Sequence, residues 1–299
     1  MARDRDDAKN IGSRRVQEDD FLLEEDEAVT LIEQPRDSLR EGYSWVRLLE
    51  VRHPGWHLAL VDGLPFRPPE QPLSESRVCL LSLAGVYAKG QKPFSTSPGP
   101  VPTELRRMRF KIRGDWSYRE IPRDTDPSAL GVAHSHFDHS DADEDANCVF
   151  PLTRLIELEL DGFIGECADI HYSLMGYVPE VRLIQSTVAQ RLIPALRKRS
   201  VNAVVVSGGC ELSHQSAGLI QREIEAAGIP TTAVSVCPDI SEQLRVPRAV
   251  GLRFPLGNPF GAALDSATQS RILRDCLSLL ESAARPGEIV RLPYAWVTT

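Results

Sequence analysis

The residue types and spacing best suited to chemistry lie in the stretch VVVSGGCELSHQ, residues 204–215. A run of β-branched residues stops at Gly208 and Gly209, and Cys210 follows them directly. Glycines let the backbone turn sharply and leave amides free to face an anion, while the N-terminus of a following helix favours a thiolate over a thiol. His214, near the first helical turn, can pair with the sulfur or move protons. The pattern predicts a reactive thiolate at Cys210, assisted by His214.

The structural alternative is that Cys210 packs as a small apolar residue and that His214 caps the helix. Cysteines inside apolar segments are usually inert, which is what we expect of Cys79, Cys148, Cys167 and Cys276. Cys210 differs from them because it stands at a glycine-flanked turn from strand to helix, the context that lowers the pKa of a thiol. The functional interpretation is therefore favoured at this position.

A second candidate is the segment HSHFDHSDADED, which contains His134, His136, Asp138 and His139. Its H-x-H-x-D-H pattern is similar to the metal motif of metallo-β-lactamase-like hydrolases. In that family the motif follows an apolar strand, whereas TDPSALGVA precedes it here. The residue types suit acid/base catalysis, binding of a substrate carboxylate, or ligation of a divalent metal such as zinc or iron. A solvated acidic loop is the structural alternative.

Length and charge restrict the class of protein. The chain has 299 residues, 42% of them hydrophobic, and a net charge of −8, which argues against nucleic acid or an anionic membrane as a partner. Residues 1–28 carry ten acidic and five basic side chains and predict a disordered acidic tail. No signal-peptide pattern appears, and no apolar run approaches the roughly 18 residues of a membrane span, so we expect a cytoplasmic protein with reduced cysteines.

Alternating strand and helix patterns predict an α/β fold with a parallel, doubly wound (Rossmann-like) sheet across residues 77–299. Two similar lobes, divided near 175–200, are a second way to arrange the same elements. Residues 29–76, rich in Pro and Gly, predict an irregular lead-in segment with one short helix. Strands are predicted at 76–87, 163–174, 201–208, 229–237, 248–257 and 288–296, and an edge strand or loop is predicted at 106–122. Helices are predicted at 151–160, 179–198 (broken near Pro194), 217–227 and 272–283. In such sheets ligands bind at the carboxyl ends of strands, where Cys210 falls.

Several segments in order resemble the selenoprotein B family of glycine, sarcosine, betaine and D-proline reductases, in its shorter, selenium-free members. The resemblance runs from about residue 72 to the C-terminus. The segments that carry it are PLSESRVCLLSLAGVYAKGQKPF, GDWSYREIPRDT, HSHFDHSDADEDANCVFPLTRL, HYSLMGY, SGGCELSHQSAGLIQREIEAAGIPT, PRAVGLRFPLGNPFG and PGEIVRLPYAW.

The resemblance implies an oxidoreductase that cleaves a C–N bond of a small amine or amino acid derivative. Written in the reverse direction, the reaction acts on X–H and Y–H to form an X–Y bond, here the C–N bond, with a disulfide as acceptor. The family uses a selenocysteine followed three residues later by a cysteine, positions held here by Cys210 and Ser213. The resolving thiol would then be Cys237, a small thiol reductant or a partner redox protein. Residues expected to bind the substrate are Ser207, Gly208, Gly209, Ser213, Asp138, His171 and Tyr172.

Two other functions stay open at this point. VNAVVVSGGC and IEAAGIPT also resemble the second half of cofactor-free aspartate/glutamate racemases, which use two cysteines. The corresponding first-half position, near Ala84 in LSLAGVY, has no cysteine, and Cys79 lies too far up the strand. The third hypothesis is a non-catalytic binding or assembly subunit of a reductase complex, which Ser213 supports.

Overall fold

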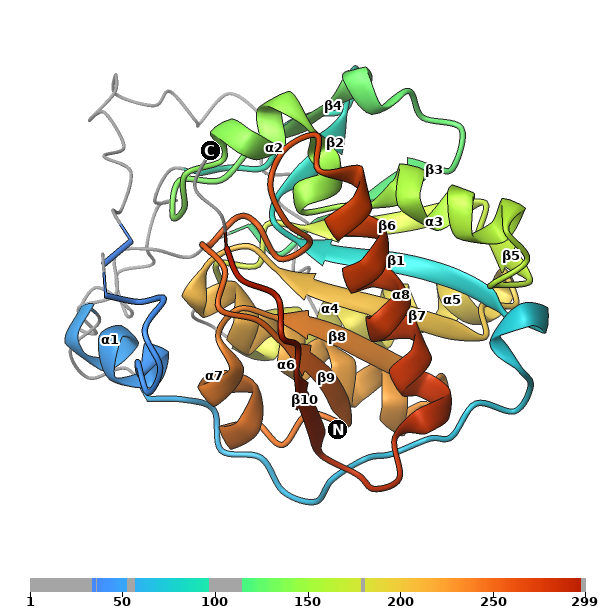
Figure 1. Ribbon diagram of the computed structural model, residues 1–299. Coiled ribbons are helices and arrows are strands. Elements are labelled where there is room, and N and C mark those ends of the chain that lie inside the picture. The colour runs from blue at the N-terminus through green and yellow to red at the C-terminus, as the bar shows by residue number, and fades with distance from the viewer. Residues whose placement is uncertain (1–33, 36, 53–56, 97–114, 179–180, 297–299) are drawn as a thin grey trace, which may run out of the picture.

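A computed structural model describes residues 34–35, 37–52, 57–96, 115–178 and 181–296. Its centre is a mostly parallel sheet with helices on both faces, which confirms the predicted α/β fold class (Figure 1). The predicted acidic tail, residues 1–28, lies outside the described residues. The same holds for residues 106–114 of the edge strand or loop predicted at 106–122.

The eight-stranded sheet has the order β10-β9-β8-β7-β1-β6-β3, with β5 pairing to β1 off this path. Its strands are β1 (Arg77–Leu83), β3 (Tyr118–Pro122), β5 (Glu166–Cys167), β6 (Ile170–Leu174), β7 (Ala203–Gly208), β8 (Thr231–Ser235), β9 (Arg248–Gly251) and β10 (Glu288–Arg291). All pairs are parallel except β3 with β6 at the edge. β2 (Val86–Ala88) and β4 (Leu130–Val132) form a separate antiparallel pair.

The strand order reverses at β1, which lies between β6 and β7. The chain leaves β1 toward β6 on one side and later returns to β7 on the other. Loops that follow strands on either side of such a switch point diverge, and ligands of doubly wound sheets bind between them. Because β1 pairs with both neighbours, the chain before and after residues 175–200 belongs to one sheet.

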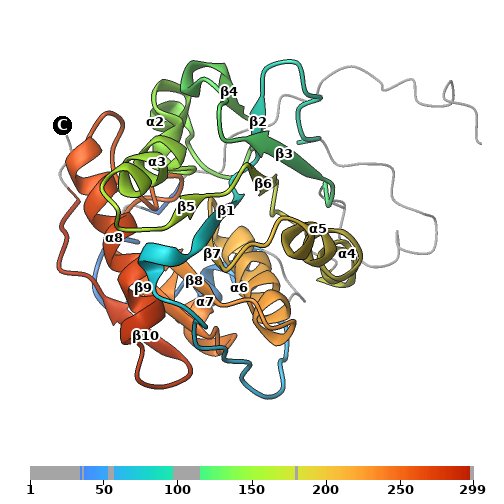
Figure 2. The same cartoon turned by 90° about the vertical axis from the view of Figure 1, so that its right-hand side faces the viewer.

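The helices form two layers, with α3 and α8 on one face of the sheet and α4 to α7 on the other (Figures 1 and 2). They are α1 (Trp45–Arg52), α2 (Ser140–Glu144), α3 (Leu152–Leu160), α4 (Val181–Thr187), α5 (Ile193–Lys198), α6 (Glu211–Ala226), α7 (Pro238–Gln243) and α8 (Ser266–Ser282), with a π-helical turn at Val188–Leu192 and 3-10 turns at Leu73–Glu75, Pro127–Ala129 and Ala146–Cys148. Within the described ranges, no helix combines the length and apolar character of a membrane span.

Two predicted elements are interrupted for identifiable reasons. The helix predicted at 179–198 becomes π-helical just before Pro194, where the proline ring lacks the amide hydrogen of a regular helix. The strand predicted at 163–174 divides into β5 and β6. Between them the ladder is broken because the amide of Leu80 donates to the ring Nδ1 of His171, at 2.9 Å, rather than to a backbone oxygen.

Helix α6 is buried along almost its whole length, including several polar side chains. The lead-in segment crosses its outer side and is held there by hydrogen bonds from backbone to buried side chains. The amide of Ala59 donates to Gln215, and the amide of Arg67 donates to Glu225. The lead-in segment therefore forms an outer layer over the helix that follows β7.

The loops at the carboxyl edge of the sheet approach one another at glycines. Gly85, directly after β1, has a φ of +74°, and a Cβ placed there would lie 2.3 Å from the carbonyl oxygen of Ala133. Gly176, after β6, has a φ of +78°, and its Cβ would lie 2.7 Å from the Cβ of Ser213. Side chains at these positions would separate the loops that meet around the end of β7.

We predict that Gly85→Ala lowers the free energy of unfolding much more than Gly90→Ala. Both glycines have positive φ, +74° and +92°, so each alanine carries backbone strain of about 1–2 kcal/mol. Only the Gly85 variant adds a backbone clash, for a total of about 2–5 kcal/mol, because the space around Gly90 is open. Urea unfolding measures the difference, and equal losses in the two variants would contradict this packing.

Candidate functional site

Cys210 lies where the sequence predicts it, two residues after the end of β7 and at the N-cap of α6. Its Sγ accepts a hydrogen bond from the amide of Ser213 at 3.3 Å. In return, the Ser213 hydroxyl oxygen accepts from the amide of Cys210 at 2.8 Å, which completes a capping box. The sulfur therefore occupies the position at a helix N-terminus where a negative charge is stabilised.

Burial of the sulfur opposes the predicted thiolate in this conformation. Cys210 is 0% exposed, and burial, followed by the charge of Glu211, raises the pKa of its thiol to about 12. The hydrogen bonds from Ser213 and from the amide of Leu212 act in the opposite direction but do not compensate. Loss of water from around the sulfur outweighs the contribution of the helix terminus, so the thiol is protonated at neutral pH.

The small residues expected to bind the substrate are engaged within the fold. The hydroxyl of Ser213 also accepts from the amide of Gly209 at 2.7 Å, so it fills the place where an anion was expected. Gly208 pairs with Leu83 in the ladder between β7 and β1. The hydroxyl of Ser207 donates to the backbone of Val149 on the face covered by α3. As these groups stand, they position Cys210.

His214 does not contact the sulfur, which corrects its predicted role as a partner of the thiolate. Its Nδ1 lies 2.7 Å from the carbonyl oxygen of Cys210, and its Nε2 accepts from the amide of Val236 at 3.2 Å. These bonds fix one neutral tautomer, with the proton on Nδ1. Burial lowers the pKa of His214 to about 4. The side chain joins the start of α6 to the end of β8.

The predicted histidine loop does lie over the end of β7. Its Phe137 is buried, and a Cβ on Gly209 would lie 2.5 Å from the Phe137 ring and 3.0 Å from Ala84. His134 packs on Phe137 with ring centroids 4.5 Å apart, and His136 stacks on Tyr177 at 3.4 Å. The switch-point crevice is thus filled by aromatic rings. Ala84 contributes no second thiol for a two-cysteine racemase.

The histidines of this loop do not converge on a metal position. The Nδ1 of His134 accepts from the amide of His136 at 3.0 Å, and its pKa is well below the usual range because of burial and the neighbouring imidazoles. His139 pairs with Asp143 at 2.6 Å, and Asp138 accepts from the amide of Ser140. Across the described ranges, no three His, Cys, Asp or Glu side chains gather around a common point.

His171 and Tyr172, expected to bind the substrate, belong to another part of the molecule. The Nε2 of His171 lies 3.3 Å from the sulfur of Cys167, and burial lowers the pKa of His171 to about 3. Burial raises the pKa of Tyr172 to about 12, and its electrostatic neighbours include Cys79 and Arg199 but not Cys210. Both residues support the junction of β6 with β1.

Glu211 is the residue of this site that the sequence interpretation missed. Its side chain is 1% exposed and forms an ion pair with Arg52, at the end of α1. Its charge is among the causes that raise the pKa of Cys210, Cys237 and Tyr177. An acidic residue in the first turn of a helix is common in any protein, so the sequence offered no signal that this one is buried.

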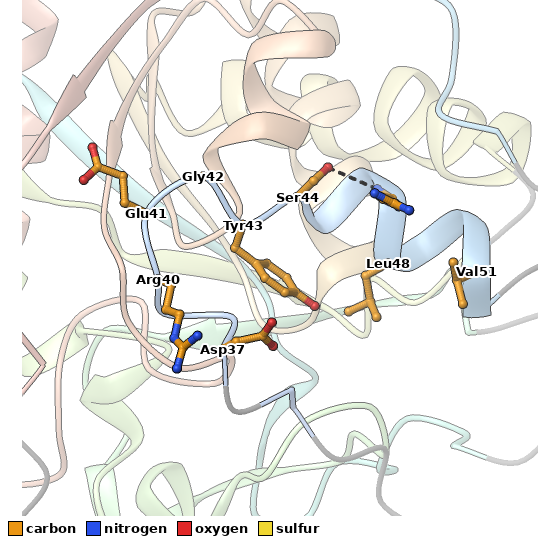
Figure 3. Close-up of a pocket in the computed structure, with 9 residues that line it drawn as sticks. Asp37, Arg40, Glu41, Gly42, Tyr43, Ser44, Leu48 and Val51 are labelled. Atoms are coloured by element: carbon orange, nitrogen blue, oxygen red, sulfur yellow. Dashed lines mark hydrogen bonds between the residues drawn. The ribbon is translucent and has the colours of Figure 1, made fainter.

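Two cavities lie beside the segment that carries α1. One of about 460 Å³ is lined by Tyr43, Leu48 and neighbouring residues, and Figure 3 shows the Tyr43 ring beside Asp37. The other, of about 470 Å³, reaches Val236 and Pro238, on either side of Cys237. Cys210 lines neither cavity. The second cavity is therefore lined both by this segment and by residues that follow β8 and β9.

Comparison with known proteins supports the resemblance noted from the sequence. The family model of glycine/sarcosine/betaine reductase selenoprotein B matches residues 102–209. D-proline reductase subunit gamma of Acetoanaerobium sticklandii is 31% identical over 80% of this chain and 98% of its own. Glycine reductase complex component B subunit gamma of Symbiobacterium thermophilum is 27% identical over 66% of this chain and 44% of its own. Sarcosine reductase complex component B subunit beta of Peptoclostridium acidaminophilum is 28% identical over 73% and 47%.

The chain spans nearly all of the D-proline reductase subunit but less than half of the glycine and sarcosine reductase relatives. No solved structure matches the chain.

We predict that the free energy of unfolding of His214→Gln falls less than that of the parent protein when the pH is lowered. His214 has a folded pKa of about 4 and an ordinary value of 6.5, so below pH 6.5 the unfolded chain binds a proton that the folded chain does not. The stability that His214 contributes is therefore complete above pH 6.5 and is lost as pH falls toward 4. Between pH 7.5 and 5 this amounts to about 2 kcal/mol.

Urea unfolding of both proteins at the two pH values measures the difference. If the variant loses as much stability as the parent between these pH values, His214 is not the buried neutral imidazole described above. Nitrogen chemical shifts of His214 in the unmodified protein give an independent check, because they distinguish the Nδ1–H tautomer from the imidazolium.

Proposed function

The chain belongs to the selenoprotein B family of glycine, sarcosine, betaine and D-proline reductases, and from that premise we propose that it is the thiol-bearing subunit of a reductase complex. In this proposal Cys210 is the reacting group in the cleavage of a C–N bond of a small amine or amino acid derivative. The observation that carries the proposal is the placement of Cys210 at the carboxyl end of β7, beside the switch point of the sheet.

The reaction needs two thiols. The Cys210 sulfur, once deprotonated, attacks the carbon and forms a C–S bond, while the C–N bond breaks and the amine leaves with a proton. A second thiol then attacks the Cys210 sulfur, so that a disulfide forms and the carbon takes a proton. The C–N bond becomes C–H and N–H, and two thiols are oxidised to one disulfide.

The second thiol cannot come from position 213, where this chain has serine. Cys237 is the candidate within the chain, because it is the N-cap of α7, next along the sheet from Cys210. Burial, and then the charges of Glu211 and Asp239, raise its pKa well above the ordinary value, so it too is protonated in this conformation. A small thiol or a partner redox protein is the alternative source.

The buried state of Cys210 favours a function within an assembly. The relatives are named as subunits or components of reductase complexes. A thiol that is 0% exposed must be uncovered before it can react, and contact with another subunit is one way to move the covering loops. We therefore propose that turnover requires partner proteins, and that the isolated chain is inactive.

The same burial supports a second candidate function, a binding or assembly subunit without catalysis. Cys210 is a protonated, inaccessible thiol, and the hydroxyl of Ser213 occupies the amides of Gly209 and Cys210. In that case Cys210 would serve as the N-cap of α6 and nothing more. The two candidates differ in what they predict for substitution of the sulfur.

We predict that Cys210→Ser lowers the rate of reductive C–N bond cleavage by at least about 100-fold in the assembled complex. Serine keeps the capping geometry but is a far weaker nucleophile, so the fold should be retained. The assay measures release of the amine with dithiothreitol as the reductant. Cys276→Ser is the matched control, because Cys276 is equally buried and burial likewise raises its pKa to about 12. Full activity of the Cys210 variant would instead support the assembly subunit.

A further inference from the structure

The carboxylate of Glu211 is an unusual group to find beside a buried thiol. Its side chain is 1% exposed, and its Oε2 accepts no hydrogen bond from any residue that the structure describes. A buried carboxylate oxygen without a donor is unfavourable, so this oxygen requires a further hydrogen-bond donor or cation. Glu211 directly follows Cys210 in the sequence and its charge acts on the Cys210 thiol, so a cation bound here would act on the same sulfur.

The cation now paired with Glu211 comes from the periphery of the molecule. Arg52 is the last residue of α1, a helix of eight residues that precedes the whole sheet in sequence. α1 packs on α6 and α7 at the end of the sheet where the parallel strands finish (Figure 1). Asp239 tethers its start, by accepting from Ser44 and from the amide of Val46.

We propose that Glu211 is the binding site for the cationic nitrogen of the substrate, and that Arg52 occupies this site in the closed structure. The inference rests on the proposed function, because a C–N bond to be cleaved brings a positively charged nitrogen to Cys210. Exchange of a guanidinium for an ammonium keeps the buried carboxylate paired, which is the condition for its burial. The ligand class is an organic ammonium ion, including quaternary ones.

Exchange at Glu211 also has a consequence for the thiol. When Arg52 leaves, the end of α1 loses its ion pair with the start of α6, and water can reach Cys210. Burial is the largest cause of the raised pKa of this thiol, whereas the amide of Ser213 lowers it and stays in place. Substrate binding would therefore make Cys210 more acidic at the moment when it is needed.

The first test needs no substrate. Alkylation by iodoacetamide, followed at each cysteine by mass spectrometry, reports how accessible and how ionised each thiol is. We expect Arg52→Ala to speed modification of Cys210 by about tenfold or more, because α1 no longer holds the site closed. Arg47→Ala is the matched control on the exposed side of the same helix and should have no effect. Equal rates at Cys210 in the two variants would overturn the proposal.

The second test asks whether Glu211 binds a cation. Methylguanidinium should bind the Arg52→Ala variant and raise the alkylation rate at Cys210 further, because a cation at Glu211 favours the thiolate without restoring the link to α1. The double variant Arg52→Ala with Glu211→Gln should not respond to the cation. A response of equal size in the double variant would show that the cation acts elsewhere and would contradict the assignment. Thermal unfolding of each variant shows whether it is folded.

The third test identifies the ligand class by calorimetric titration. Betaine and 3,3-dimethylbutanoate have the same shape, but only betaine carries a charged nitrogen. We expect betaine to bind about tenfold more tightly to Arg52→Ala than to the parent, since the competing guanidinium is gone, and not to bind Glu211→Gln. Glycine, sarcosine and D-proline, titrated in the same way, test the smaller amines.

The outcomes of the third test separate this proposal from the proposed function. Tighter binding of 3,3-dimethylbutanoate than of every amine would overturn the cation site. Glu211-dependent binding of an amine without turnover in any complex would instead leave the cation site in place and refute the reductase.

Discussion

The hydroxyl group of Ser213 makes the interaction on which the site depends. It accepts from the amides of Gly209 and Cys210, while the sulfur of Cys210 accepts from the amide of Ser213. These bonds begin α6 immediately after β7 and fix the sulfur at the helix N-terminus. They also use up the amides that could have bound an anion. The Ser213 side chain thus fixes the position of the thiol. It also occupies the backbone amides that were expected to bind an anion beside the thiol.

The electrostatics of the closed site follow from this arrangement and from its covering. Phe137 fills the space over Gly209, and the aromatic and histidine side chains of its loop exclude water from the sulfur. With water absent, burial dominates the pKa of Cys210, and a carboxylate on the next residue requires a cation. Arg52 supplies that cation from a segment outside the sheet. The lead-in segment therefore belongs to the electrostatic balance of the site, although it contributes no strand.

Local patterns in the sequence were sufficient for the sheet and for the position of Cys210. Strands rich in valine, such as β7, and helices that end at a glycine, such as α6 before Gly228, have signals that do not depend on distant contacts. The split between β5 and β6 had no such signal. It arises because the His171 ring takes the place of a backbone partner for Leu80, a contact across strands that are far apart in the sequence.

The sequence by itself determined that a cysteine follows a central parallel strand, that a helix comes after it, and that a histidine loop belongs to the same protein. Only the tertiary structure decided what these residues do. In the folded chain, His214 contacts two backbone groups and His171 lies away from the site. Glu211 pairs with Arg52, which is 159 residues earlier in the sequence. The physical reason is that dipoles and capping depend on neighbours in the chain, whereas burial depends on every segment that excludes water. The pKa of Cys210 depends chiefly on burial.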